Sequence, residues 1–189
     1  MDRVKRYRRG AYLEVALAVL TIPYLVVGAL CMAYDDNPSL RFSFLGIAFC
    51  GAAVSVYLWL LNKDLLNHAF NFSRVDKLIY AMVVITAASF LSPVVGLAPA
   101  VVVLFIVLAV SAVNGIVTVK IGFMIRNCES DMFGYRNNIS LALILIGALG
   151  MTIVLIPVAE LISIAFCINM AKVYFAASDA MRDRAVVHT

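Results

Sequence analysis

Three polar side chains fall deep within apolar stretches of the sequence. Asn114 and Asn169 lie at similar expected depths in two separate stretches, and Glu160 follows Pro157 early in the last one. Polar groups are costly inside a membrane, so they mark either a substrate path or hydrogen bonds between helices. The spacing makes Asn114, Asn169 and Glu160 candidates for lining a substrate path, and hydrogen bonding between helices is the alternative for the two asparagines.

Two acidic residues have simpler structural interpretations. Glu160 is expected in the first turn of its helix, where the helix dipole favours an anion, so we expect it to cap that helix. If the helix starts earlier, Glu160 lies deeper and becomes a candidate proton or cation site. Glu14 falls three residues inside the first apolar stretch, and we expect an interfacial carboxylate paired with the basic N-terminus.

No combination of residues has the spacing of a known catalytic or metal centre. The two histidines, His68 and His188, fall in a connecting segment and in the tail, and the four cysteines form no C-x-x-C pair. The sequence contains no H-E-x-x-H, G-x-S-x-G or Walker motif. We therefore expect a protein that is not an enzyme, with no catalytic residue, metal site or cofactor.

The composition is typical of a chain that is surrounded by lipid. Of the 189 residues, 64% are hydrophobic and 14% are charged. Soluble domains contain about 45–50% apolar and about 25% charged residues, because their surface must face water. The apolar stretches lack the alternation of barrel strands, so they are expected to be membrane-spanning helices.

A helix needs roughly 20 apolar residues to cross the hydrocarbon core. On this basis the sequence predicts an all-α transmembrane bundle of six spans arranged as three hairpins. Residues 1–10 form a basic N-terminus and residues 178–189 a tail. Residues 64–76 are expected to form either a short interfacial helix or a solvated linker. The spans are expected at about 11–33, 42–61, 78–97, 100–119, 139–156 and 158–177.

Two apolar blocks are too long to form one span each. Residues 78–119 carry no formal charge, and as one helix they would measure about 63 Å, twice the hydrocarbon thickness. Residues 139–177 pose the same problem, and we place the break at Pro157. One long kinked helix is the alternative for this second block. In the first block the chain is expected to fold back at a cluster of helix breakers, Pro93, Gly96 and Pro99.

The distribution of charge predicts which side of the membrane each end occupies. In the six-span arrangement, Arg41 is the only one of the 15 lysines and arginines in an outer segment. The positive-inside rule then places both chain ends in the cytoplasm. The first apolar stretch is longer than that of a signal peptide, so we expect it to be retained. Contact with anionic headgroups, rather than with nucleic acid, is expected for Arg3, Lys5, Arg6, Arg8, Arg9, Lys120 and Lys172.

These features leave three functional interpretations. The first is a non-enzymatic accessory or binding component of a membrane assembly in a prokaryotic plasma membrane, with a membrane protein partner or a second copy. The second is a small transporter or substrate-capture subunit, with a path between the fourth and sixth spans. The third and weakest is a lipid-active enzyme that uses Glu14 or residues 120–138. Size, span number and orientation are compatible with substrate-binding subunits of vitamin-type transporters, and equally with other small prokaryotic membrane proteins.

Overall fold

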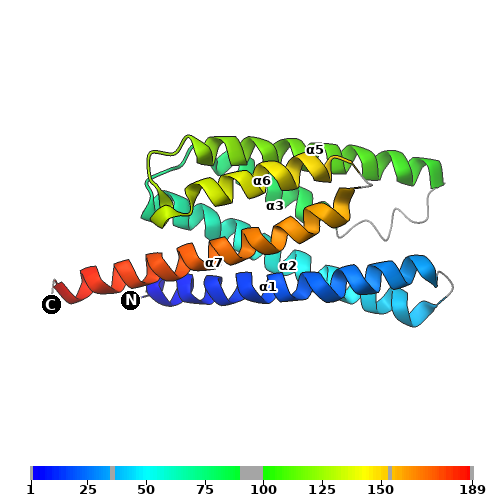
Figure 1. The fold of residues 1–189 in the computed structure, drawn as a ribbon, viewed down its shortest axis with the longest axis horizontal. Coiled ribbons are helices and arrows are strands. Elements are labelled where there is room, and N and C mark those ends of the chain that lie inside the picture. Colours follow the sequence, from blue (N-terminus) through cyan, green and yellow to red (C-terminus); the bar gives the residue numbers. More distant parts are fainter. Residues whose placement is uncertain (1, 35–36, 90–99, 153–154, 188–189) are drawn as a thin grey trace.

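The computed structural model describes residues 2–34, 37–89, 100–152 and 155–187, and in these ranges the chain is all-α (Figure 1). The predicted fold class is confirmed at this level. The described ranges contain six α-helices and a short 3-10 turn, η1 (Met132–Gly134). The helices are α1 (Asp2–Ala33), α2 (Pro38–Ala69), α3 (Asp76–Ser89), α5 (Ala100–Arg126), α6 (Arg136–Gly150) and α7 (Ile156–Val187).

Four of these helices are long and apolar enough to cross a membrane. The qualifying segments are Arg3–Cys31, Pro38–Ala69, Phe105–Arg126 and Ile156–Asp183, in α1, α2, α5 and α7. The apolar helix α6 has 15 residues and would span about 22 Å, less than the hydrocarbon core of about 30 Å. The last eight residues of the predicted third span, 90–97, lie outside the described residues. The described helices therefore support a multi-pass membrane protein.

The turn between α1 and α2 is determined by local sequence. Asn37 is the N-cap of α2, and its side-chain oxygen accepts hydrogen bonds from the backbone nitrogens of Ser39 (3.0 Å) and Leu40 (3.4 Å). Pro38 occupies the first helical position, where its missing N–H leaves no hydrogen bond unmade. The local sequence thus provides a well-capped start for α2.

Several helices run beyond the expected spans. The first helix begins at Asp2, so the basic N-terminus is helical, and α7 continues through most of the expected tail to Val187. The segment 64–76 is neither an interfacial helix nor a solvated linker. Its first six residues complete α2, and the connection after them is pinned by buried Phe72 and Val75. These apolar side chains fill the core, which is why the segment does not lie in solvent.

The chain reverses between α6 and α7, so residues 139–177 are not one kinked helix (Figure 1). The turn begins with hydrogen bonds from Met151 N to Gly147 O (3.2 Å) and from Thr152 N to Leu149 O (3.1 Å). It precedes Pro157, although we expected the break at that residue. Pro157 is instead the second residue of α7, where a helix tolerates proline well.

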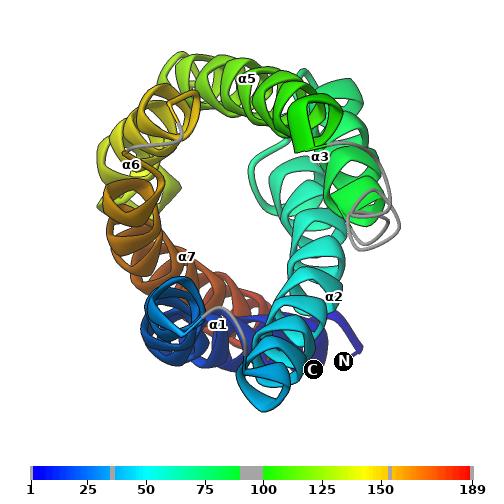
Figure 2. The same cartoon turned by 90° about the vertical axis from the view of Figure 1, so that its right-hand side faces the viewer.

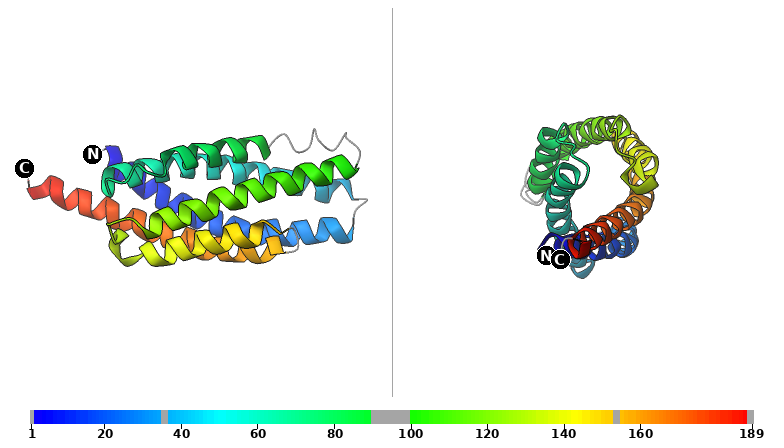
Figure 3. Two further views of the ribbon diagram at one scale, coloured as in Figure 1. Left: turned by 90° about the horizontal axis from the view of Figure 1, so that it is seen from above. Right: turned by 90° about the vertical axis from the view of Figure 1, so that its left-hand side faces the viewer.

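The helices form a closed ring in the order α1, α2, α3, α5, α6, α7 (Figure 2). Each helix packs against its neighbours in this order, and α7 closes the ring against α1. The first residues of α1 and the last residues of α7 lie at the same end, which we call the termini end (Figure 3). Side chains fill the ring there, in a core that includes Tyr7, Leu65, Ile79, Ile121, Ile139 and Tyr174.

Candidate functional site

A cavity of about 820 Å³ occupies the ring at the end opposite the termini. It is bordered by α1, α2, α3, α5 and α7, and its described lining is mostly aliphatic and aromatic. Glu160 is the only formally charged residue among the described lining residues. The polar side chains that reach this cavity are Thr21, Tyr24, Ser55, Thr86, Asn114 and Glu160.

Small residues of α2 leave space for the cavity. Ala48, Ala52 and Ser55 follow one another at helical spacing and all line it, together with Gly51. The sequence pattern Ala48-x-x-x-Ala52 is typical of close helix packing in lipid, but here it borders open volume. The core ends and the cavity begins near Trp59, which lines both the cavity and a narrow gap of about 20 Å³ in the core.

Two of the three candidates for a substrate path meet at this cavity. Asn114 reaches it from α5 and Glu160 from α7, two helices separated in the ring by α6. The side-chain oxygen of Asn114 is buried and has no hydrogen-bond partner in the described part of the chain. It is therefore an unpaired acceptor at the edge of the cavity.

Glu160 does not cap α7. The helix begins at Ile156, and no acidic residue lies in its first turn. The Ser163 hydroxyl donates to the Glu160 backbone oxygen (2.6 Å) and approaches its carboxylate (3.5 Å). The capping interpretation is therefore wrong, because the helix starts earlier than expected and places Glu160 deeper in the bundle.

The third candidate, Asn169, is not among the residues that line the cavity. Its amide nitrogen donates to the Ala165 backbone oxygen at 2.7 Å, within its own helix. That hydrogen bond does not join two helices, and Asn169 does not line a substrate path at this cavity. The similar expected depth of Asn114 and Asn169 was a weak signal, because the position of a residue around the helix determines which surface it faces.

Glu14 is buried between α1, α2 and α7, with 1% of its surface exposed. Cys167 and Asn62 lie beside its carboxylate, although neither carboxylate oxygen has a partner at hydrogen-bonding geometry among the described residues. The expected ion pair with the basic N-terminus is not among the ion pairs formed by the described residues. The expectation was wrong because Glu14 faces the packed interior, whereas Arg3 and Arg6 reach α2.

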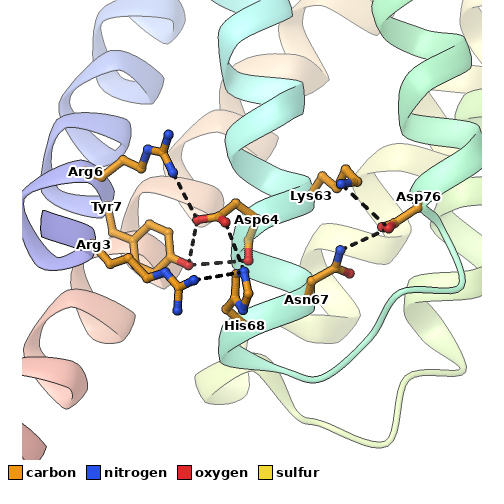
Figure 4. Close-up of polar contacts among 8 residues, drawn as sticks. All are labelled: Arg3, Arg6, Tyr7, Lys63, Asp64, Asn67, His68 and Asp76. Carbon is orange, nitrogen blue, oxygen red and sulfur yellow. Dashed lines mark hydrogen bonds and ion pairs between the residues drawn. The ribbon is translucent and has the colours of Figure 1, made fainter.

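Charged residues at the termini end connect α1 to α2 (Figure 4). Asp64 accepts a hydrogen bond from the Tyr7 hydroxyl at 3.2 Å and forms an ion pair with Arg6 at 3.7 Å, and its carboxylate lies 3.3 Å from Nε2 of His68. Arg3 lies 3.1 Å from the His68 ring nitrogen. Two of the predicted lipid-contacting cations therefore face this cluster.

A second carboxylate joins α2 to the start of α3 (Figure 4). Asp76 pairs with Lys63 at 3.8 Å and accepts a hydrogen bond from the Asn67 amide at 3.0 Å. The Lys63 ammonium also lies 5.0 Å from the centre of the Tyr80 ring. These contacts fix the termini end of α2 against both neighbouring helices.

The remaining predicted lipid contacts are exposed. Lys5, Arg8, Arg9 and Lys120 are on the surface, and contact with anionic headgroups remains the expectation for them. Lys172 is also exposed, with its ammonium 5.5 Å from the centre of the Tyr135 ring. Its position suits the same role.

Sequence reasoning missed several polar residues, some at the cavity and some between the cavity and the termini end. Thr21, Ser55 and Thr86 are polar residues within apolar stretches, a signal that could have singled them out. The Tyr174 hydroxyl also donates a hydrogen bond to Asn62 (2.5 Å). These two residues are far apart in the sequence, so no spacing rule could have found this contact.

The cavity is large enough to hold an organic solute. In the described ranges, no group of three or more histidine, cysteine, aspartate or glutamate side chains is placed to hold a metal ion. Searches against protein-family models, curated proteins and solved structures give no match to this chain.

Proposed function

We propose that the protein binds a largely apolar organic solute in this cavity and acts as a transporter, or as the substrate-capture subunit of one. The observation that carries the proposal is the cavity of about 820 Å³ with Asn114 and Glu160 in its wall. Binding sites for organic molecules typically measure about 300–1,000 Å³, with apolar walls and a few polar groups. A capture subunit would also satisfy the first interpretation, a binding component of a membrane assembly.

The lining favours one class of solute. Aromatic side chains such as Phe44 and Trp59 suit an apolar body, whereas the Asn114 oxygen and the Glu160 carboxylate accept hydrogen bonds. A solute with a cationic or donor group would complement both acceptors. A free carboxylate on the solute would be disfavoured, because it would meet Glu160 without a balancing cation.

The position of the core indicates the direction of entry. Packed side chains fill the ring at the termini end, so the solute would enter from the opposite end. The positive-inside rule favours a cytoplasmic termini end in a prokaryotic plasma membrane. The cavity would then accept its solute from the outer side. Release to the cytoplasm would require the core contacts to open.

Cysteine labelling tests this access. Ser55→Cys, in a variant without the four native cysteines, should react with a membrane-impermeant maleimide added outside and not with the same reagent added inside. Ala87→Cys is the control, because Ala87 is exposed on α3 and is not part of the cavity lining. Equal labelling of Ser55→Cys and Ala87→Cys would contradict the proposal.

A matched pair of probes tests the solute class. Trp59 is the only tryptophan in the sequence, so its fluorescence reports on the cavity wall. We expect 4-phenylbutylamine to change the fluorescence at lower concentration than 4-phenylbutyrate, and Glu160→Gln to remove that preference. Tighter binding of the acid would overturn the assignment of the cationic class.

A further inference from the structure

We propose that Glu14 is a proton-binding site that couples solute movement in the cavity to proton movement. Glu14 would hold one proton when the helices are packed as in this structure. It would release the proton when solute binding separates α1 from α7. The coupling rests on the proposed solute-binding function, whereas the proton site itself does not.

The surroundings of Glu14 favour its neutral form. An ionised carboxylate in an apolar interior is costly unless cations or hydrogen-bond donors compensate it. The groups that face Glu14 are Asn62 from α2 and Cys167 and Tyr174 from α7, and none of them is a cation. A bound proton removes the charge, so the packed state stabilises the carboxylic acid.

Glu14 lies next to the cavity, on the side of the termini end. Leu17, one helical turn further along α1, lines the cavity, about 4.5 Å away along the helix axis. On α7, Glu160 and Cys167 are seven residues apart and therefore lie on the same face. A small separation of α1 from α7 would admit water from the cavity to Glu14. The O–H bond of the acid would then break, and the proton would pass to that water and leave a solvated carboxylate.

Hydroxyl groups lead from Glu14 towards the termini end. The Tyr174 hydroxyl donates to the Asn62 side-chain oxygen at 2.5 Å. The rings of Tyr174 and Tyr7 are 6.0 Å apart, and the Tyr7 hydroxyl donates to Asp64 at 3.2 Å. These groups line a route by which a proton could return to Glu14 from the termini end and restore the neutral acid.

Infrared spectroscopy tests the proton site without any solute. The wild-type minus Glu14→Gln difference spectrum of protein in lipid nanodiscs at neutral pH should contain the C=O band of a protonated acid. Glutamine mimics the neutral acid, so this variant should fold. Glu129→Gln, at an exposed position, should instead remove carboxylate bands. Carboxylate bands in the Glu14→Gln difference would overturn the proposal. If Glu14→Gln does not fold, Glu14→Asp should keep the acid band at a shifted frequency. Carboxylate bands in place of that acid band would also overturn the proposal.

The pH dependence of solute binding tests the coupling. If binding of 4-phenylbutylamine releases one proton from Glu14, its affinity should rise with pH, by up to about tenfold per pH unit. Glu14→Gln should bind the amine without this dependence, while the preference over 4-phenylbutyrate persists because Glu160 is intact. A pH dependence that survives in Glu14→Gln would refute the coupling. If the acid band of Glu14 is present but the amine does not bind, the proton site stands and the proposed solute-binding function is contradicted.

Discussion

Gly115 of α5 and Gly147 of α6 lie against each other's backbone. A methyl group added at either residue would come within 2.6 Å of the carbonyl oxygen of the other. Small residues permit such close approach between helices in lipid, where tight packing replaces the hydrophobic effect as a driving force. Because Asn114 precedes Gly115, this contact also fixes where Asn114 stands in the cavity wall.

Replacing Gly147 with alanine should therefore destabilise the protein. The added methyl group would force α5 and α6 apart, at an expected cost of about 1–3 kcal/mol in the free energy of unfolding. Gly150→Ala is the control, because nothing lies within 4 Å of a side chain added there. Alanine's higher helix propensity should make that control neutral or more stable by up to about 1 kcal/mol. Unfolding in a denaturing detergent measures both, and equal effects would contradict the close contact.

The two asparagines of the predicted path should differ in their effect on binding. Asn114→Leu removes the unpaired acceptor in the cavity wall and should weaken binding of 4-phenylbutylamine by about tenfold, the loss expected for one hydrogen bond to a charged donor of about 1.5 kcal/mol. Asn169→Leu removes a hydrogen bond within α7 and should leave binding unchanged. Titration of Trp59 fluorescence measures both affinities. An equal loss in the two variants would place Asn169 on the path after all.

Asp64 should contribute more to stability than a surface acid does. Asp64→Asn weakens contacts with Tyr7, Arg6 and His68, and we expect a loss of about 1–3 kcal/mol in the free energy of unfolding. Asp179→Asn breaks a pair with Arg182 in which both side chains are more than half exposed. Such pairs contribute about 0–1 kcal/mol, so this control should change little. The same unfolding assay would contradict the prediction if the two variants behaved alike.

The all-α architecture and the hydropathy of the spans could be predicted because both depend on local sequence. Which surface a polar residue faces depends on helix rotation and on the partner helix, and hydropathy does not encode either one. Asn114 and Asn169 illustrate this. Both were expected at a similar depth, but Asn114 lines the cavity, whereas Asn169 forms a hydrogen bond within its own helix. Glu14 was placed at the interface from its sequence depth, whereas α7 packs over it and buries it.

The exposed N-terminal cations should determine lipid preference. All five N-terminal cations are exposed, but only Arg3 and Arg6 have a described partner, in His68 and Asp64 respectively. Replacing Lys5, Arg8 and Arg9 with glutamine should weaken retention of phosphatidylglycerol, at about 1 kcal/mol per cation. Native mass spectrometry of bound lipid measures the change. Replacing Arg3 and Arg6 should affect lipid retention less, and the reverse order would contradict this assignment.

The orientation of the ring decides from which side the cavity fills, and reporter fusions can determine it. The charge distribution predicts a cytoplasmic termini end, so fusions there should report an inner location and fusions at the opposite end an outer one. Outer readings are expected after Asp36, Val95 and Thr152, and inner readings after Asn71, Ser130 and Thr189. Asp36, Val95 and Thr189 fall outside the described residues, whereas Thr152 lies in the turn before α7 and Asn71 in the connection after α2. An outer reading after Thr189 would mean an odd number of crossings, and the cavity could no longer be assigned to the outer side on the positive-inside rule.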